Sequence, residues 1–282
     1  MVRLMQTLPV LTDRPALDRN RARALRAPAL FLHAEAQSEL QERLSEVNRT
    51  FTAPAVVTGF PDFWQGVMPN AQIVADTEVL NLQPGAHDLI FHVLCLHWAN
   101  DPVGQLVQCL RALRPDGLFL AVLFGGQTLA QLRTALAEAE TQVSGGLSPR
   151  VLPMGELRDL GGLLQRAGFA LPVADSTART VRYRDLCHLM ADLRAMGESN
   201  ALHQRLRRPT RRQLFAKAAQ IYQGAFADPD GLLPATFDMV YLTGWAPDDS
   251  QQKPLRPGSA THSLAQHLGA VAAPLPRAPC GG

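Results

Sequence analysis

Three residues that close short apolar segments are suited to ligand chemistry. His97 follows the apolar run 88–96, and it is the best candidate for a general base because histidine as a residue type can accept and release a proton near neutral pH. Asp76 closes the run 72–76, where a carboxylate could hold the hydroxyl groups of a ligand. Gly59 closes the run 53–59 and could let bare main chain approach a ligand. These residue types predict a pocket where the apolar segments end.

Each of these residues also has a purely structural interpretation. His97 could pack in the core beside Trp98, Asp76 could cap a turn or a helix, and Gly59 could be a simple turn after a strand. Asn100 and Asp101 are placed to cap the helix that Pro102 begins.

The apolar pattern predicts the elements that must position these residues. Continuous apolar runs bounded by Gly and Pro indicate buried strands, and spacings of three and four residues indicate helices. The predicted strands are 53–59, 72–76, 88–96, 118–124, 174–183 and 236–245. The predicted helices are 16–25, 34–47, 102–113, 128–143, 155–167, 185–196 and 210–226.

Strands that alternate with helices predict an α/β fold with a mostly parallel sheet and right-handed crossovers. The pocket is then expected at the carboxyl ends of the strands. We expect an N-terminal helical segment at 1–50, an α/β domain at 51–268 with a helical insertion at about 184–230, and a disordered tail at 269–282.

Composition excludes several classes of protein. Four cysteines without a CxxC pair and no clustered histidines argue against a disulfide framework and against a metal site. The sequence shows neither a secretory signal nor a transmembrane segment, so we expect a cytoplasmic protein, with peripheral attachment to the inner membrane as an option. The formal charge of +2 says nothing about nucleic acid, which we do not expect as a partner.

Several segments, in order, resemble class I S-adenosylmethionine-dependent methyltransferases. These segments are 76–82 (DTEVLNL), 84–91 (PGAHDLIF), 96–101 (LHWAND), 111–120 (RALRPDGLFL) and 166–169 (RAGF). Others resemble a branch shared by complex I assembly factors and malonyl-carrier-protein methyltransferases. They are 125–129 (GGQTL), 145–150 (GGLSPR), 159–164 (DLGGLL), 192–200 (DLRAMGESN) and 244–251 (GWAPDDSQ).

The resemblance implies a Rossmann-like fold and S-adenosylmethionine as the cofactor. On the donor side it places Thr58, Gly59, Asp76, Thr77 and His92. On the substrate side it places Trp98, Asn100, Ser199 and Asn200, with His97 as the candidate catalytic base.

The first strand departs from the family pattern. Methyltransferases of this class carry a Gly-x-Gly-x-Gly loop there, because a Cβ would collide with the donor. Here 56–62 reads VVTGFPD, so only Gly59 remains and Phe60 and Pro61 stand where small residues are expected. In the family, one acidic residue ends the second strand and another lies in a later turn before the fourth strand. Asp76 matches both positions at once, which is possible only if a strand and a helix between them are missing. The sequence therefore predicts a sheet shortened near its second and third strands.

Three functions therefore stay open. The leading hypothesis is a methyltransferase-like protein linked to complex I assembly or protein modification; mitochondrial relatives of that branch modify an arginine, so the resemblance also permits hydroxylation. The second is a non-catalytic assembly factor that has lost the donor site. The third is a malonyl-carrier-protein methyltransferase.

A run of basic residues could dock an acyl carrier protein or an anionic membrane, or it could simply form a solvated face. This run comprises Arg205, Arg207, Arg208, Arg211 and Arg212.

Overall fold

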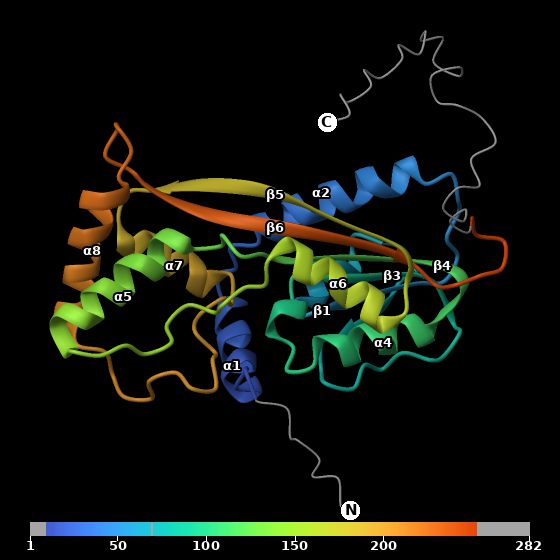
Figure 1. Cartoon of the computed structure of the whole chain (residues 1–282), viewed down its shortest axis with the longest axis horizontal. Coiled ribbons are helices and arrows are strands. Elements are labelled where there is room, and N and C mark those ends of the chain that lie inside the picture. The colour runs from blue at the N-terminus through green and yellow to red at the C-terminus, as the bar shows by residue number, and fades with distance from the viewer. Residues whose placement is uncertain (1–9, 69, 253–282) are drawn as a thin grey trace, which may run out of the picture. The chain divides into compact units, whose positions relative to one another are not determined.

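The computed structural model describes residues 10–68 and 70–252 of the 282-residue chain (Figure 1). The predicted tail at 269–282 and the predicted boundary at residue 268 lie outside the described residues. In the described part of the N-terminal segment, the chain forms two helices, α1 (Arg14–Ala24) and α2 (Phe31–Glu46). Both overlap the helices predicted there.

The described residues form one six-stranded sheet in the order β2-β1-β3-β4-β6-β5. The four neighbours β2, β1, β3 and β4 run parallel, whereas β6 is antiparallel to both β4 and β5. This arrangement confirms the predicted α/β class and mostly parallel sheet. The bounds are β1 (Pro54–Thr58), β2 (Gln72–Ala75), β3 (His87–Val93), β4 (Leu113–Phe124), β5 (Ala170–Tyr183) and β6 (Leu233–Trp245).

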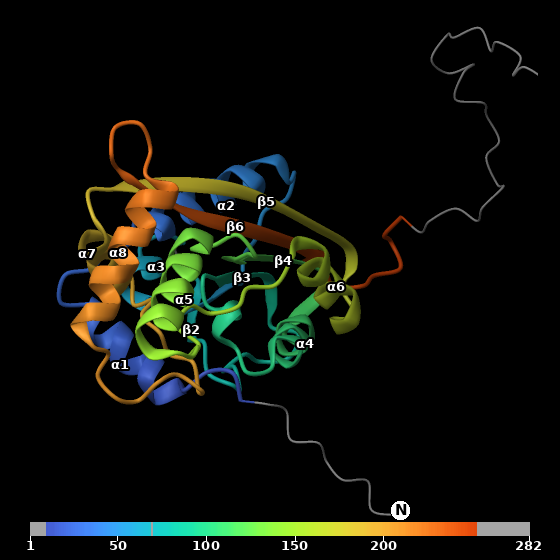
Figure 2. The same cartoon turned by 60° about the vertical axis from the view of Figure 1, so that its left-hand side comes forward.

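Helices cover both faces of the sheet because successive residues of the buried strands point to opposite sides. In β1, Val56 joins one core cluster while Ala55 and Val57 join the other. Helices α4 (Pro102–Ala112) and α6 (Leu157–Ala167) pack with the cluster that contains Val57, and they lie together in Figures 1 and 2. Asp101 caps α4, as the sequence predicts, by accepting a hydrogen bond from the Gly104 N–H at 2.8 Å.

The other face is covered by helices from several parts of the chain. Side chains of α2, α3, α5, α7 and α8 join the core cluster that contains Val56. Helices α7 and α8 come from the β5–β6 connection, which confirms the predicted extra helices before the last strand, and α8 lies beside α5 (Figures 1 and 2). Their bounds are α3 (Pro61–Gln65), α5 (Ala130–Ser144), α7 (Leu186–Ala195) and α8 (Arg212–Phe226).

Strand β4 starts earlier than the sequence suggests. Residues 114–117, which lie between the predicted helix 102–113 and the predicted strand 118–124, belong to this strand, and its register against β3 shifts between His87 and Leu89. Asp116 takes a left-handed φ of 60°, and its N–H donates to the carbonyl of Ala246 at 3.1 Å. These residues therefore form an irregular part of a longer strand, because their main chain makes a hydrogen bond to a distant segment at Ala246.

Candidate functional site

The parallel strands bring their carboxyl ends to one edge of the sheet. Thr58, the last residue of β1, is in register with Ala75 of β2 on one side and with Val93 of β3 on the other. Gly59 and Asp76, which come next along β1 and β2, are therefore neighbours at this edge. The sequence predicted that they would meet there.

Asp76 is buried and surrounded by arginines from α1. Its Oδ1 accepts a hydrogen bond from Nη1 of Arg21 at 2.7 Å, and Arg14 donates to its main-chain carbonyl at 2.7 Å. Burial acts to raise the pKa of Asp76, but the two guanidinium groups outweigh it and lower that pKa. The carboxylate is thus an anion whose charge is already balanced within the chain.

Arg21 fills the space beside the first strand. A Cβ added to Gly59 would lie 2.3 Å from Cζ of Arg21, so the guanidinium lies directly on the bare main chain of that glycine. The Arg21 side chain is 7% exposed. Phe60 is also buried, and its ring packs 5.0 Å from the ring of His33. As arranged here, this region does not leave room for the nucleoside that the family resemblance places on it.

The other predicted donor-side residues make hydrogen bonds within the protein. Thr58 Oγ1 accepts from the Phe60 N–H at 3.1 Å, and Thr77 Oγ1 donates to the Val79 carbonyl at 2.7 Å. His92 is fully buried, with Nε2 3.0 Å from Oε1 of Gln105, and Gln105 in turn donates to the carbonyl of Thr77 at 2.9 Å. Burial, only partly offset by Gln105, lowers the pKa of His92 to about 4, so its imidazole is neutral at pH 7.

A second cluster, which contains residues predicted for the substrate side, lies where the chain leaves β3. Leu94 takes a left-handed φ of 47° and turns the chain into a short 3₁₀ helix (Leu96–Trp98). Trp98 Nε1 donates to Oε2 of Glu198 at 2.8 Å, and Nε2 of His97 lies 3.4 Å from the same oxygen. The structure therefore joins His97 and Trp98 to an acid 100 residues away in the sequence.

Glu198 carries a negative charge in this cluster. Its side chain is only 11% exposed, and burial acts to raise its pKa, yet His97, Arg21 and the Trp98 indole together lower the pKa. Both side-chain contacts use Oε2, so Oε1 has no hydrogen-bond partner within the described residues. One carboxylate oxygen is therefore available to a ligand.

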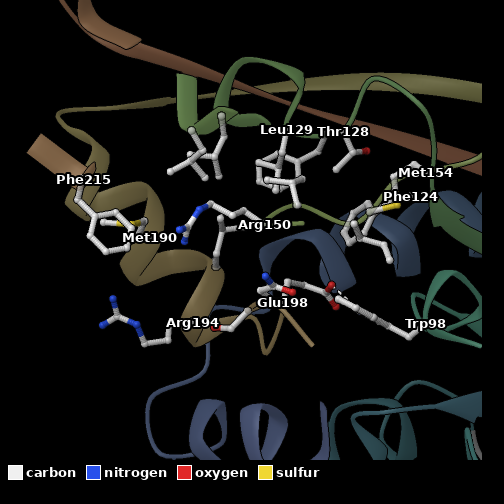
Figure 3. A pocket seen from close by; sticks show the side chains of 18 residues that line it. Trp98, Phe124, Thr128, Leu129, Arg150, Met154, Met190, Arg194, Glu198 and Phe215 are labelled. Atoms are coloured by element: carbon white, nitrogen blue, oxygen red, sulfur yellow. Dashed lines mark hydrogen bonds between the residues drawn. The ribbon is translucent and has the colours of Figure 1, made fainter. Parts of the chain in front are cut away.

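Glu198 lines a largely apolar cavity of about 270 Å³ (Figure 3). In the figure Arg150 and Glu198 lie between Phe215 and Arg194 on one side and Trp98 and Phe124 on the other. Two arginines line the cavity. Arg150 forms an ion pair with Glu140, whereas Arg194 forms no ion pair within the described residues. The remaining walls include Phe124, Thr128, Leu129, Leu132, Leu136, Val151, Leu152, Met154, Met190, Leu193 and Phe237.

The three polar residues predicted for the substrate side have structural partners. Asn100 Oδ1 accepts from the N–H groups of Leu11 and Thr12 at 2.9 and 2.8 Å. The Ser199 carbonyl accepts from Asn20 of α1 at 3.0 Å, and Asn200 donates to the Pro149 carbonyl at 2.8 Å. Ser199 and Asn200 also line the cavity, whereas Asn100 does not.

Sequence reasoning missed two residues that dominate the site, Arg21 and Glu198. Glu198 lies inside the segment 192–200 that carried the resemblance, directly before Ser199 and Asn200, which were predicted for the substrate side. Arg21 shares a helical face with the buried Leu17 and Ala24, at spacings of four and three residues. That spacing was the available signal that Arg21, among the arginines of α1, points inward.

Two further properties of the described residues bear on function. None of their helices combines the length and apolar character that a membrane span requires. They also contain no group of three or more His, Cys, Asp or Glu side chains that could hold a metal ion.

Known proteins resemble the chain over most of its length. A family model described as a methyltransferase domain matches residues 37–121. The mitochondrial arginine-hydroxylase NDUFAF5 of Danio rerio is 37% identical over 231 residues, which cover 81% of this chain and 72% of the relative. The human protein of that name is 36% identical over 78% of this chain, and the match covers 64% of its length, less than two thirds. A malonyl-[acyl-carrier protein] O-methyltransferase of Halorhodospira halophila is 31% identical over 75% of this chain and 70% of its own.

Proposed function

Because the chain belongs to the class I S-adenosylmethionine-dependent methyltransferase family, in the branch that contains the arginine hydroxylases and the malonyl-carrier-protein methyltransferases, we propose that it binds a partner protein through an arginine side chain. The arginine is taken from the name of the arginine-hydroxylase relatives, and the protein partner from the name of the malonyl-[acyl-carrier protein] O-methyltransferase relative. Through the resemblance to assembly factors, the partner is a subunit of respiratory complex I.

The observation that carries this proposal is the free carboxylate oxygen of Glu198 in an aromatic cavity. Carboxylates pair well with guanidinium groups, which present parallel N–H donors. Trp98 and Phe124 line the same cavity, and aromatic rings can attract a cation. An arginine side chain would thus find its counter-charge at one side of the cavity and apolar walls along its stem.

His97 acts in this proposal as a positioning residue for Glu198. Its Nε2 faces the Glu198 carboxylate, its ring packs 4.9 Å from Phe124, and it is not among the residues that line the cavity. A group in that place holds the carboxylate and stabilises its charge. The general-base role predicted from the sequence would require a proton path from the cavity to His97.

Calorimetry with Nα-acetyl-L-arginine methylamide tests the proposal. We expect the wild-type chain to bind this probe and to bind the citrulline analogue, which has the same shape without the charge, at least tenfold more weakly. Glu198→Gln should lose the same factor for the arginine probe. Glu138→Gln, which changes an exposed acid on α5, is the matched control and should bind like the wild type. Equal affinity for arginine and citrulline would overturn the proposal.

The second candidate function, a non-catalytic assembly factor, is favoured by the arrangement of Arg21 over Gly59. A chain whose donor region is closed can still hold a partner's arginine at Glu198. Binding of the arginine probe is therefore common to both functions, and only binding of S-adenosylmethionine separates them.

The third candidate, methylation of a malonyl carrier protein, fits the cavity less well. Its acceptor is a carboxylate, which the Glu198 anion would repel. Asp13 already engages two members of the basic run, Arg205 and Arg207. Charge reversal at the exposed Arg208 and Arg212 should weaken binding of an acyl carrier protein if this function holds, and unchanged affinity would count against it.

A further inference from the structure

The guanidinium of Arg21 occupies a place that the fold otherwise offers to a ligand. It lies on Gly59, the one glycine left from the donor loop, and 2.7 Å from Asp76, the acid that follows β2. In open α/β sheets, these positions at the carboxyl ends of the strands bind ligands. Here the side chain of Arg21 occupies both positions, against Gly59 and against Asp76.

Asp76 is fully engaged by α1. Oδ1 lies 2.7 Å from Arg21 and 3.3 Å from Nη2 of Arg14, and Oδ2 lies 3.3 Å from Nη1 of Arg14. A ligand hydroxyl could reach this carboxylate only if the arginines moved away. Helix α1 and a ligand are thus alternatives for one acid.

The closed arrangement leaves donors of Arg21 without partners. Nε and Nη2 are buried and have no hydrogen-bond partner within the described residues. Buried donors without partners are unfavourable, so the closed state is less stable than a fully hydrogen-bonded one would be. The two donors without partners therefore lower the free energy that is needed to displace the Arg21 side chain.

Polar contacts hold α1 in this place. Asn20 donates to the Ser199 carbonyl at 3.0 Å, and Asp13 pairs with Arg205 at 2.8 Å. Gly197, with a left-handed φ of 79°, lets the 197–200 loop lie against both Arg21 and Phe60, since an added Cβ would come within 3.1 Å of each. The same helix therefore contacts the donor region and a loop that lines the Glu198 cavity.

We infer that Arg21 is an internal competitor for the donor site, so that S-adenosylmethionine or its product binds only when α1 releases Asp76. The apparent affinity of the donor is then reduced by the fraction of molecules in which α1 is closed. This inference does not depend on what occupies the Glu198 cavity. It agrees with the family's cofactor and also explains why the site in this structure does not fit it.

Calorimetry with S-adenosylhomocysteine on the full chain tests the competition. We expect Arg21→Ala to bind at least tenfold more tightly than the wild type, and Arg21→Met to do the same while keeping more of the side-chain volume. Arg19→Ala, an exposed arginine on the same helix, should bind like the wild type. Equal affinity in wild type and folded Arg21 variants, or no binding to any of them, would overturn the inference.

Hydrogen exchange gives a second readout that needs no variant. Saturating S-adenosylhomocysteine should speed amide exchange in α1 of the wild-type chain, because the helix leaves its place. Binding with unchanged or slower exchange in α1 would also overturn the inference. Neither experiment uses the arginine probe, so failure here leaves the proposal for Glu198 untouched, and the reverse is equally true.

Discussion

Buried charges set the properties of this site at the scale of single residues. Asp76 and Glu198 have lowered pKa values in spite of burial, since arginines, His97 and hydrogen bonds stabilise their anions. His33 and His92 show the opposite balance: burial dominates and lowers the pKa of each to about 4. The neutral histidines and the anionic acids therefore respond to different ranges of pH.

The histidines predict a loss of stability on mild acidification. Their unfolded pKa is near 6.5 and their folded pKa is about 4, so between these values the unfolded chain binds protons that the folded chain does not. The free energy of unfolding should thus fall as the pH drops from 6.5 to 4, by up to about 3 kcal/mol for each histidine. Urea unfolding at pH 7.5, 6.0, 5.0 and 4.5 measures this.

Variants identify the source of that loss. His92→Gln should reduce the dependence on pH between 6.5 and 4, whereas His203→Gln, at an exposed position, should leave it unchanged. Below pH 4, protonation of Asp76 and Glu198 adds a separate loss, because their folded pKa values lie below the ordinary ones. A urea concentration at the midpoint of unfolding that stays constant from pH 7.5 to 5.0 would contradict the assignment to the histidines.

At the scale of elements, local sequence determines where helices end. Helix α6 stops at Gly168, which takes a left-handed φ of 95° and whose N–H donates to the Leu164 carbonyl at 3.1 Å. Only glycine adopts this conformation without strain. Gly162, inside the same helix, has no such role, and an added Cβ there would meet nothing within 4 Å.

These two glycines should respond oppositely to the same substitution. Gly168→Ala should destabilise the protein by about 1 kcal/mol, since alanine is strained at that φ. Gly162→Ala should stabilise it by up to about 1 kcal/mol, because alanine is the better helix former. Thermal unfolding of both variants gives the comparison, and a shift of equal sign in the two would contradict the account of the helix end.

At the scale of the whole molecule, α1 is held by residues far along the chain. Asp13 accepts from the Ala16 N–H at its own helix start and also pairs with Arg205 and Arg207. Thr12 forms a bridge with Leu202, and the Asp13 N–H donates to the Ala201 carbonyl at 2.8 Å. The segment around residue 200 therefore fixes the position of a helix that begins at residue 14.

Asp13→Ala should loosen this attachment. It removes the helix cap and both ion pairs, so we expect a cost of about 1–2 kcal/mol and at least tenfold faster amide exchange in α1. Asp18→Ala, an exposed acid on the same helix, should change exchange little. If Asp13→Ala leaves exchange in α1 unchanged, other contacts hold the helix.

The sequence by itself determined the local features of this protein. Apolar runs identified the strands, Asp101 marked the start of a helix, and the alternation of strands and helices identified the parallel α/β class. It also placed Gly59 and Asp76 at one edge. These features depend on neighbours in the sequence or on a fixed backbone period, so a pattern of residues specifies them.

Only the tertiary structure decided what occupies that edge. The site depends on Arg21, which is 55 residues from Asp76, and on Glu198, which is 100 residues from Trp98. Whether a charged side chain turns inward depends on a distant counter-charge that makes its burial tolerable, and no local pattern encodes that partner. The sequence thus departs from the family's glycine loop, while the structure places an arginine of the same chain on the glycine that remains.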